Sequence, residues 1–401
     1  MSKTMKIPDG WEKIKLDSLV NIDCKSLGSK TEQGYTFRYI SLSDVKKGVI
    51  NPDVPVVKFE NAPSRARRIV QRGDVLFSTV RPNLEGYARI NVFEENLIAS
   101  TGFAVLSPAA EDDTEFIYQY LYSYHIKKQI YALVVGSNYP AVNSSDVAHL
   151  RLIVPESLIE RKTIVGVLSV WDEGIEKITK LIALKEKKLD GYACNLFQRK
   201  KINSFPGWKS VALNKILLEH SDQSTGTEEV FSVSVHKGLI NQIEHLGRSF
   251  AASNTEKYNR VHYGDIVYTK SPTGNFPLGI VKQSYIEKDV IVSPLYGVFT
   301  PKTFNLGVIL NFYFSSPQRA RNYLFPIIQK GAKNTIAMTN KTFMSKTLYL
   351  PEDETDQKSI AEYVITAQKE IDLLKKIADK YKEQKKGLMQ KLLTGEWRVG
   401  A

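Results

Sequence analysis

Residues that could carry out covalent or metal chemistry are few in this chain, and they follow no familiar catalytic spacing. A phosphate-binding loop of the form G-x-x-x-x-G-K-[ST] does not occur, nor does a G-x-G-x-x-G segment or a G-x-S-x-G nucleophile elbow. None of the six histidines stands at metal-ligand spacing from a cysteine or from another histidine. The segment 137–140 shares part of the Asn/Asp-Pro-Pro-aromatic loop of amino-methyltransferases but lacks its second proline. The sequence therefore predicts a non-catalytic protein with no metal site and no cofactor of its own.

The charge balance points to a polyanionic partner. Lysine and arginine number 55 against 43 aspartates and glutamates, which gives a net charge of +12. Such a surplus favours nucleic acid, because each neutralised phosphate releases condensed counterions. An ordinary basic surface would have the same composition, so charge alone does not decide the matter. The chain shows no apolar stretch of membrane-spanning length, and its two cysteines are far apart, which predicts a cytoplasmic protein without membrane contact.

Polar side chains that could contact DNA are concentrated in segments that read as loops. Arginine and lysine can bind guanine O6 and N7, asparagine can bind adenine N6 and N7, and others would hold phosphates. The candidates in the first half are Arg65, Arg67, Arg68, Arg81, Asn83, Ser137, Asn138 and Tyr139. Those in the second half are Arg260, Lys270, Thr273, Asn275, Lys333, Asn334 and Thr335. Any one of them alone is equally compatible with a solvated loop, but together the clusters favour DNA.

The elements that position these loops occur twice. GWEKIKLDSLV at 10–20 returns as GWKSVALNKIL at 207–217, and RGDVLFST at 72–79 returns as YGDIVYTK at 263–270. LIASTGFAVLSP at 97–108 and FIYQYLYS at 116–123 are followed by counterparts at 290–301 and 308–315. All pairs keep their order, so the chain is a tandem duplication of a unit of about 197 residues. The loops differ between the copies, which predicts that the two halves read different sequences.

Each repeat divides into a β-rich part and a helical part. Short β-branched and aromatic runs separated by Gly, Pro and Asn predict a strand-dominated mixed domain, with one helix around 115–131. The expected fold class is α+β, with two tandem β-rich recognition domains separated by two long helices. The predicted segments are a first domain at 1–155, a first helix at 156–200, a second domain at 201–350, and a second helix with the C-terminal tail at 351–401.

The helical parts carry an apolar residue at alternating steps of four and three. This spacing of 3.5 residues is typical of a left-handed coiled coil. The seam predicted in the first copy is Ile164, Leu168, Trp171, Ile175, Ile178 and Ile182, and in the second copy it is Ile360, Val364, Ile371, Leu374, Tyr381 and Leu388. One lysine interrupts each seam, Lys185 in the first and Lys385 in the second.

An amphipathic helix cannot bury its apolar stripe alone. The economical arrangement pairs the two helices within the chain, and an antiparallel pair would place the β-rich domains at opposite ends of a rod. The alternatives are that each helix packs on its own globular domain or on another chain.

These features together resemble the specificity subunit of a type I restriction–modification system. The resemblance covers the whole length and rests on the openings Pro8–Trp11 and Phe205–Trp208, on the Gly-Asp-led strands, and on the proline-led long helices. The ending KGLMQKLLTGEWRV at 386–399 also belongs to it.

The resemblance implies a DNA-binding subunit that takes part in DNA methylation and host defence. It would recognise a bipartite site in double-stranded DNA, one half per domain, with the coiled coil acting as the ruler for an unspecified spacer. It further implies two methyltransferase subunits and a restriction and motor subunit as partners. S-adenosylmethionine, ATP and Mg²⁺ would be bound by those partners and not by this chain. Base-contacting residues vary with the target, so the loop candidates above rest on position and chemistry alone.

Two other kinds of protein fit part of the pattern. One is a tethering protein whose coiled coil holds two modules for protein or glycan ligands, and its binding would not respond to salt. The other is a stand-alone DNA-binding regulator, which would work without methyltransferase partners.

Overall fold

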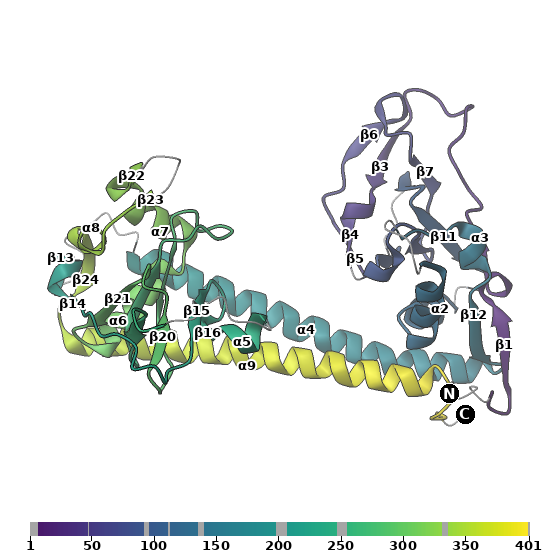
Figure 1. The fold of residues 1–401 in the computed structure, drawn as a ribbon. Helices are drawn as coiled ribbons and strands as arrows, with labels where there is room; N and C mark the ends of the chain where they lie inside the picture. The colour runs from purple at the N-terminus through teal and green to yellow at the C-terminus, as the bar shows by residue number, and fades with distance from the viewer. Residues whose placement is uncertain are drawn as a thin grey trace. The chain divides into compact units, whose positions relative to one another are not determined.

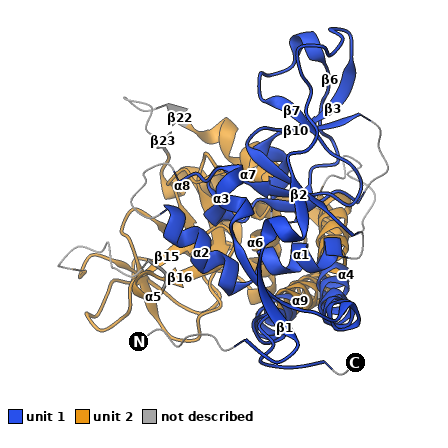
Figure 2. Cartoon of the chain, turned by 90° about the vertical axis from the view of Figure 1, so that its right-hand side faces the viewer, with its two compact units in different colours: residues 1–179, 376–401 blue, residues 180–375 orange. Residues whose placement is uncertain are grey.

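A computed structural model describes residues 7–46, 48–91, 96–110, 113–134, 140–197, 207–246, 255–330 and 336–399. The chain forms two compact units, residues 1–179 with 376–401 and residues 180–375 (Figure 2). Each unit consists of one β-rich segment together with half of each long helix. The expected α+β class is confirmed, because two β-rich regions and two long packed helices make up the chain.

One four-stranded antiparallel sheet recurs in both units. In unit 1 its order is β2-β11-β8-β9, formed by Val20–Ile22, Phe103–Pro108, Val75–Ser78 and Tyr87–Arg89. In unit 2 its order is β14-β21-β18-β19, formed by Leu217–Glu219, Gly297–Pro301, Ile266–Thr269 and Ile280–Gln283. The register also matches, since Val20 pairs with Pro108 and Leu217 with Pro301. The sequence repeat is therefore a repeat of one sheet in one register.

A two-stranded antiparallel ladder joins the beginning of each β-rich segment to its end. In unit 1, β1 (Trp11–Lys15) pairs with β12 (Arg151–Pro155). In unit 2, β13 (Trp208–Ala212) pairs with β24 (Thr347–Pro351). In both ladders the tryptophan of the opening motif stands opposite the proline that precedes the long helix, so each β-rich segment enters and leaves at one place.

The two units differ in the strands added to the shared sheet. Unit 1 has a second four-stranded sheet of order β6-β3-β10-β7, formed by Val56–Lys58, Thr36–Ile40, Leu97–Ser100 and Ala66–Ile69. Its β3–β10 pair is parallel. Unit 2 instead pairs β15 with β16 and β17 with β20, formed by Phe231–Ser234, Gly238–Asn241, Asn259–Val261 and Val290–Val292. Two short hairpins complete the strands, β4 with β5 at Val45–Lys46 and Val49–Ile50, and β22 with β23 at Gln329–Lys330 and Ile336–Ala337.

The helix predicted around 115–131 is two helices, so that prediction was wrong in one respect. α1 spans Asp113–Leu121 and α2 spans Tyr124–Val134. Between them the Ser123 side chain accepts a hydrogen bond from the backbone N–H of Ile126, at 3.3 Å, and begins the second helix. In unit 2, α6 (Phe304–Phe314) and α7 (Pro317–Leu324) are separated at the corresponding place by two serines. A serine hydroxyl competes with the helix backbone for hydrogen bonds, which a pattern of apolar residues does not reveal.

The described residues also form three short helices, α3 at Ser144–Ala148, α5 at Gln242–Leu246 and α8 at Asn340–Ser345.

The two long helices are α4 (Leu158–Phe197) and α9 (Glu354–Leu392), drawn in teal and yellow in Figure 1. They begin two to three residues after the predicted starts at 156 and 351, because β12 and β24 extend to Pro155 and Pro351 and a short connection follows each strand. Within each unit they run antiparallel and in contact. In unit 1 the rings of Trp171 and Tyr381 meet at 5.5 Å, and in unit 2 Lys185 reaches Glu370.

The apolar stripes of both helices are largely enclosed. Every predicted seam residue is buried or half-buried except Tyr381, which is 38% exposed. The seam also continues into the globular cores. Ile164 and Leu168 pack with Met389 and Leu392 in the unit 1 core. Helix pairing and packing on the β-rich segment, which the sequence presents as alternatives, therefore occur together.

Both lysines that interrupt the seam form an ion pair with the other helix. The Lys185 ammonium lies 2.6 Å from the Glu370 carboxylate in unit 2. The Lys385 ammonium lies 2.6 Å from Asp172 and donates to the side-chain amide oxygen of Gln119 at 2.9 Å in unit 1. Burial lowers the pKa of Lys385, and the hydrogen bond to Asp172 opposes that effect. Polar groups at seam positions specify register at some cost in stability.

Removal of the acidic partner should therefore be more harmful than removal of the lysine. We expect Asp172→Ala to lower the free energy of unfolding by about 1–3 kcal/mol, because the Lys385 side chain is only 14% exposed and would lose its countercharge. Lys385→Met should be neutral or stabilising. Urea unfolding followed by circular dichroism measures both. Glu186→Ala, which breaks the exposed cross-helix pair with Lys375, is the matched control and should cost less than about 1 kcal/mol. Equal losses for all three variants would contradict this account.

Candidate nucleic-acid interface

The connection between β8 and β9 in unit 1 presents polar side chains on a constrained backbone. Arg81 and Glu85 both have positive φ, 50° and 57°, and they flank a 3₁₀ turn at Pro82–Leu84. Left-handed backbone at non-glycine residues is costly and recurs at functional sites. Two contacts hold the turn in place. The Tyr87 hydroxyl donates to the Pro82 carbonyl, and Glu85 forms an ion pair with Lys127 of α2 at 2.6 Å. The side chains of Arg81 and Asn83 are exposed on this rigid support.

A second predicted loop of unit 1 adjoins this turn. The backbone N–H of Arg81 donates to the carbonyl of Pro140 at 2.8 Å, and that of Val142 donates to Thr79 at 2.9 Å. The predicted residues Ser137, Asn138 and Tyr139 immediately precede Pro140 and lie outside the described residues. Two segments about 60 residues apart in sequence thus meet at the end of β8.

The arginine cluster of unit 1 lies on β7 and not in a loop, which corrects the prediction for two of its members. Arg68 forms an ion pair with Asp23 at 2.8 Å and is half-buried. Arg67 donates to a backbone carbonyl and stacks over the ring of Phe59, 4.7 Å from its centroid. Arg68 therefore links β7 to the segment that follows β2, and Arg67 packs on the 3₁₀ turn that contains Phe59. Arg65, which precedes the strand, has an exposed side chain.

The corresponding connection in unit 2 is the β18–β19 hairpin, residues 270–279. Thr273 and Phe276 exchange backbone hydrogen bonds at 3.1 and 2.8 Å, which closes a tight tip. Thr273 and Asn275 are exposed at this tip, and Lys270 is half-buried at its base, where burial lowers the pKa of its ammonium group. Gly279 closes the hairpin at a φ of 100°, and a β-carbon there would lie 2.1 Å from the Thr269 carbonyl. Different polar groups thus stand at the same register position of the two sheets.

Arg260, another candidate of unit 2, lies on a strand and not in a loop. Arg260 lies on β17, half-buried, and donates to the Gln223 carbonyl at 2.9 Å while pairing with Glu228 at 3.3 Å. The predicted loop position of Arg260 was wrong, because the residue lies within β17, and its contact with DNA stays a prediction. Lys333, Asn334 and Thr335 fall between β22 and β23 and lie outside the described residues.

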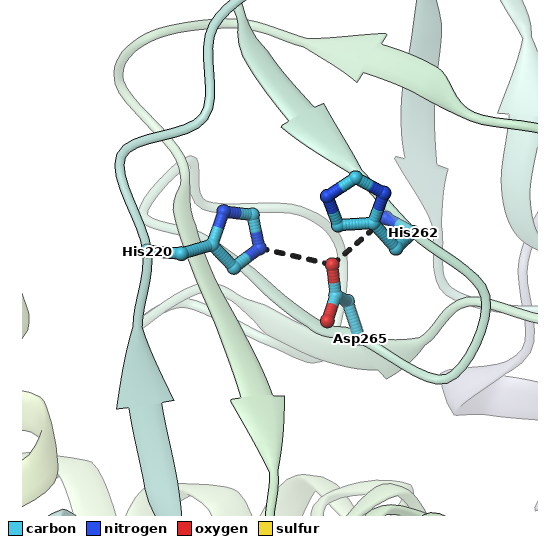
Figure 3. A group of neighbouring side chains, drawn as sticks. All are labelled: His220, His262 and Asp265. Atoms are coloured by element: carbon cyan, nitrogen blue, oxygen red, sulfur yellow. Dashed lines mark hydrogen bonds and ion pairs between the residues drawn. The ribbon is translucent and has the colours of Figure 1, made fainter.

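One group of side chains was missed by sequence reasoning. His220, His262 and Asp265 place their side-chain ligand atoms within 4.8 Å of one another in unit 2 (Figure 3). The two histidines are 42 residues apart, so a search for local metal-ligand spacing does not pair them. The sheet register would have revealed them, because β14 and β18 both flank β21.

Comparison with known proteins identifies the class. Residues 8–186 match the family model of the type I restriction modification DNA specificity domain. A putative type I restriction enzyme specificity subunit, MjaX of Methanocaldococcus jannaschii, is 25% identical over 98% of this chain and 95% of its own length. The chain therefore carries this DNA specificity domain over residues 8–186 and is similar to a specificity subunit over nearly its whole length. It is a specificity subunit, and such subunits are non-catalytic.

Solved structures share the fold over the full length. A chain from a structure of the type I R-M system, described for its complex assembly and conformational transition, superposes with a TM-score of 0.59 at 20% identity and covers 98% of this chain and all of its own. The S subunit of the type I restriction-modification system from M. genitalium superposes with a TM-score of 0.58 at 16% identity, with 98% of each chain covered. Among the described residues, no helix combines the length and apolar character needed to cross a bilayer.

Proposed function

We propose that this specificity subunit reads a bipartite, asymmetric site in double-stranded DNA, one half with each β-rich segment. The observation that carries this proposal is the repeated sheet with unlike loops. The backbone register is conserved between the copies, whereas Arg81 and Asn83 in one correspond to the hairpin of Thr273 and Asn275 in the other. A shared sheet that carries different hydrogen-bonding groups suits the recognition of two different sequences.

The residues proposed to contact DNA are those whose side chains remain exposed at the end of the shared sheet. Arg81 is the strongest of them, because a guanidinium on a rigid turn can bind guanine O6 and N7 in a bidentate manner. Asn83, Thr273 and Asn275 would add base or phosphate contacts. The candidates Ser137, Asn138, Tyr139, Lys333, Asn334 and Thr335 stay predictions from the sequence.

We further propose that the α4–α9 pair sets the length of the spacer and binds two methyltransferase subunits, with a restriction and motor subunit joining through the complex. A structure described for complex assembly of the type I R-M system has the same fold, which supports an assembly of this kind. S-adenosylmethionine for adenine methylation, and ATP with Mg²⁺ for translocation and cleavage, would be held by those partners.

The test of DNA reading is salt dependence combined with one substitution. We expect affinity for the methylated site to fall steeply as salt rises, because phosphate contacts release counterions. Arg81→Ala should weaken specific binding by about 1–3 kcal/mol and relax the preference at one base pair of one half-site. Fluorescence anisotropy with labelled duplexes, using the complex with its methyltransferase partners, measures both effects.

Arg151→Ala is the matched control, since Arg151 is an exposed arginine of the same unit at the start of β12. It should leave specificity unchanged. Binding that does not respond to salt would favour the tethering alternative, in which the two modules hold protein or glycan ligands. If the purified chain bound the same site with full specificity in the absence of any partner, the stand-alone regulator would be favoured.

A further inference from the structure

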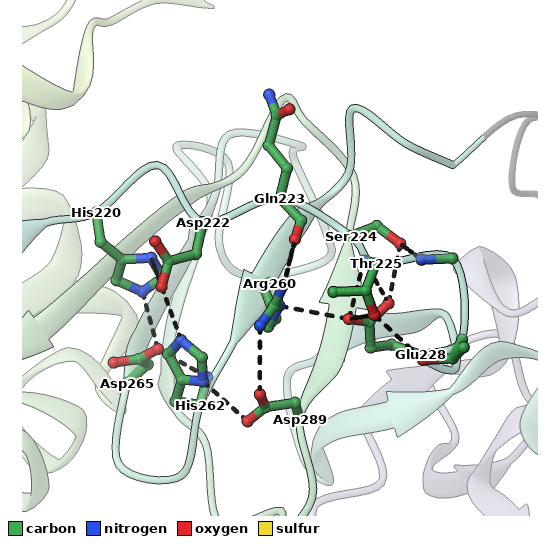
Figure 4. A network of polar contacts seen from close by, with 12 residues as sticks. His220, Asp222, Gln223, Ser224, Thr225, Glu228, Arg260, His262, Asp265 and Asp289 are labelled. Atoms are coloured by element: carbon green, nitrogen blue, oxygen red, sulfur yellow. Dashed lines mark hydrogen bonds and ion pairs between the residues drawn. The ribbon is translucent and has the colours of Figure 1, made fainter.

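Two histidines and three aspartates meet at the end of the shared sheet in unit 2 (Figure 4). His220 and Asp222 belong to the loop that follows β14, and His262 and Asp265 belong to the turn between β17 and β18. Asp289 directly precedes β20. The cluster therefore brings together segments that are about 40 residues apart in the sequence.

Each imidazole has one ring nitrogen committed to a carboxylate. His220 Nε2 lies 3.0 Å from Asp265 Oδ2, and His262 Nδ1 lies 2.8 Å from Asp289 Oδ1. A carboxylate on one ring nitrogen orients the imidazole, and a metal ion bound at the other nitrogen would replace any proton held there. This is the outer-shell arrangement that orients histidines at metal sites.

The other two ring nitrogens face the same carboxylate oxygen. His262 Nε2 is 3.1 Å from Asp222 Oδ2, and His220 Nδ1 is 3.9 Å from that same atom. His220 Nδ1 is buried and has no hydrogen-bond partner among the described residues. Ligands of a tetrahedral zinc ion, with bonds of about 2.0 Å, stand about 3.3 Å apart, so these separations need little adjustment.

We propose that unit 2 contains a binding site for a divalent transition metal such as Zn²⁺, with His220 Nδ1, His262 Nε2 and Asp222 as protein ligands. A water molecule would complete a tetrahedral set. Asp265 and Asp289 act as the outer shell. Asp265 is buried and rigidly placed, because it accepts from the Thr300 hydroxyl and from the backbone N–H of His262, both at 2.8 Å. A bound metal would tie the loop after β14 to the turn before β18.

The first copy provides an internal comparison at the same register. There Asp74 accepts from the backbone N–H of Gln71 at 2.8 Å, as Asp265 does from His262. The strand pairings β2–β11 and β14–β21 align Asp23 with His220 and Lys25 with Asp222. Unit 1 thus has glutamine, aspartate and lysine where unit 2 has its three ligands, and a lysine would repel a cation. The site is therefore a feature of the second copy alone.

The experiment is metal binding to the full-length chain after treatment with a chelator. We expect ZnCl₂ titration by calorimetry to show one equivalent bound, CoCl₂ to give the visible absorption of a nitrogen- and oxygen-ligated Co²⁺ ion, and ZnCl₂ to raise the midpoint of thermal unfolding. His262→Asn and Asp222→Asn should each weaken zinc binding at least tenfold and abolish the thermal shift.

Asp222 keeps these outcomes distinct from misfolding, because its side chain is 56% exposed and Asp222→Asn should unfold like the wild type without metal. Asp289→Asn should weaken binding by about 10–100-fold, as outer-shell changes do. His149→Asn, which removes an exposed histidine of unit 1, is the control and should change nothing. A chain that binds no zinc, or that binds it equally after Asp222→Asn and His262→Asn, would overturn the proposal and leave a proton shared among His262 and its two carboxylates.

Discussion

Lengthening both long helices by one heptad should lengthen the unspecified spacer of the methylated site by about three base pairs and leave both half-sites unchanged. Seven helical residues add about 10 Å, and B-DNA rises 3.4 Å per base pair. The effect follows from the proposal that the α4–α9 pair measures the distance between the half-sites. A site with the original spacer would then be about 10 Å too short for the two β-rich segments to reach both half-sites.

The structure specifies where the insertions should go. A copy of residues 173–179 placed after Thr179, and a copy of residues 369–375 placed after Lys375, each add two seam residues. Both insertions fall at the boundary of the two compact units. The cross-helix pairs of Lys185 with Glu370 and of Lys385 with Asp172 then stay intact, because each pair lies within one unit.

Methylome sequencing of cells that carry the variant with its partner subunits measures the spacer directly. The control is the α4 insertion alone, which offsets one helix against the other and should abolish methylation through loss of the seam. Methylation by the double-insertion variant at the original spacer length would contradict the ruler function while leaving half-site recognition intact.

Exchange of one recognition segment should change one half of the methylated site and leave the other unchanged. Each mismatched base pair costs about 1–3 kcal/mol, so two altered positions in a half-site would shift preference by about 2–6 kcal/mol. This effect is large enough to replace the target completely. The same methylome measurement reports it, with the two half-sites serving as each other's reference.

The boundaries for the exchange follow from the closing ladder of unit 1. Replacing residues 16–150, in place of 1–155, keeps β1 paired with β12. It also keeps Asp9, whose carbonyl accepts from Arg398 of the C-terminal tail at 2.9 Å. Gln119 should be restored in the donor segment, because it bonds both Asp172 and Lys385. Exchange of residues 213–346 is the reciprocal variant, and a change of both half-sites by either exchange would disprove modular reading.

The features that could be predicted from the sequence are those that depend on local spacing or that occur in both repeats. The duplication was visible because collinear segments repeat, and the register of β2–β11 against β14–β21 shows the same repeat in space. The long helices were visible because a period of 3.5 residues persists over many turns. These patterns depend on neighbours a few residues apart, so a single sequence contains them.

The features that could not be predicted depend on contacts between distant segments. Arg68 and Arg260 resemble loop cations in sequence, yet Asp23 and Glu228 convert them into parts of the framework. The second sheet of unit 1 includes a parallel pair, β3 with β10, whose strands are far apart in the chain. His220 and His262 converge for the same reason. In each case the partner is chosen by sheet register, which local spacing does not encode.

The seam lysines also bear on which helices can pair when two molecules meet. By the repeat, Glu370 of α9 corresponds to Gly174 of α4, and Asp172 of α4 corresponds to Gln368 of α9. If α4 paired with α4 of a second molecule, Lys185 would face a glycine, and in an α9–α9 pair Lys385 would face a glutamine. Duplication creates two nearly interchangeable helices, and these two acidic residues make the mixed pair the one in which both lysines are neutralised. Association of two molecules through like helices is thereby disfavoured relative to the α4–α9 pair.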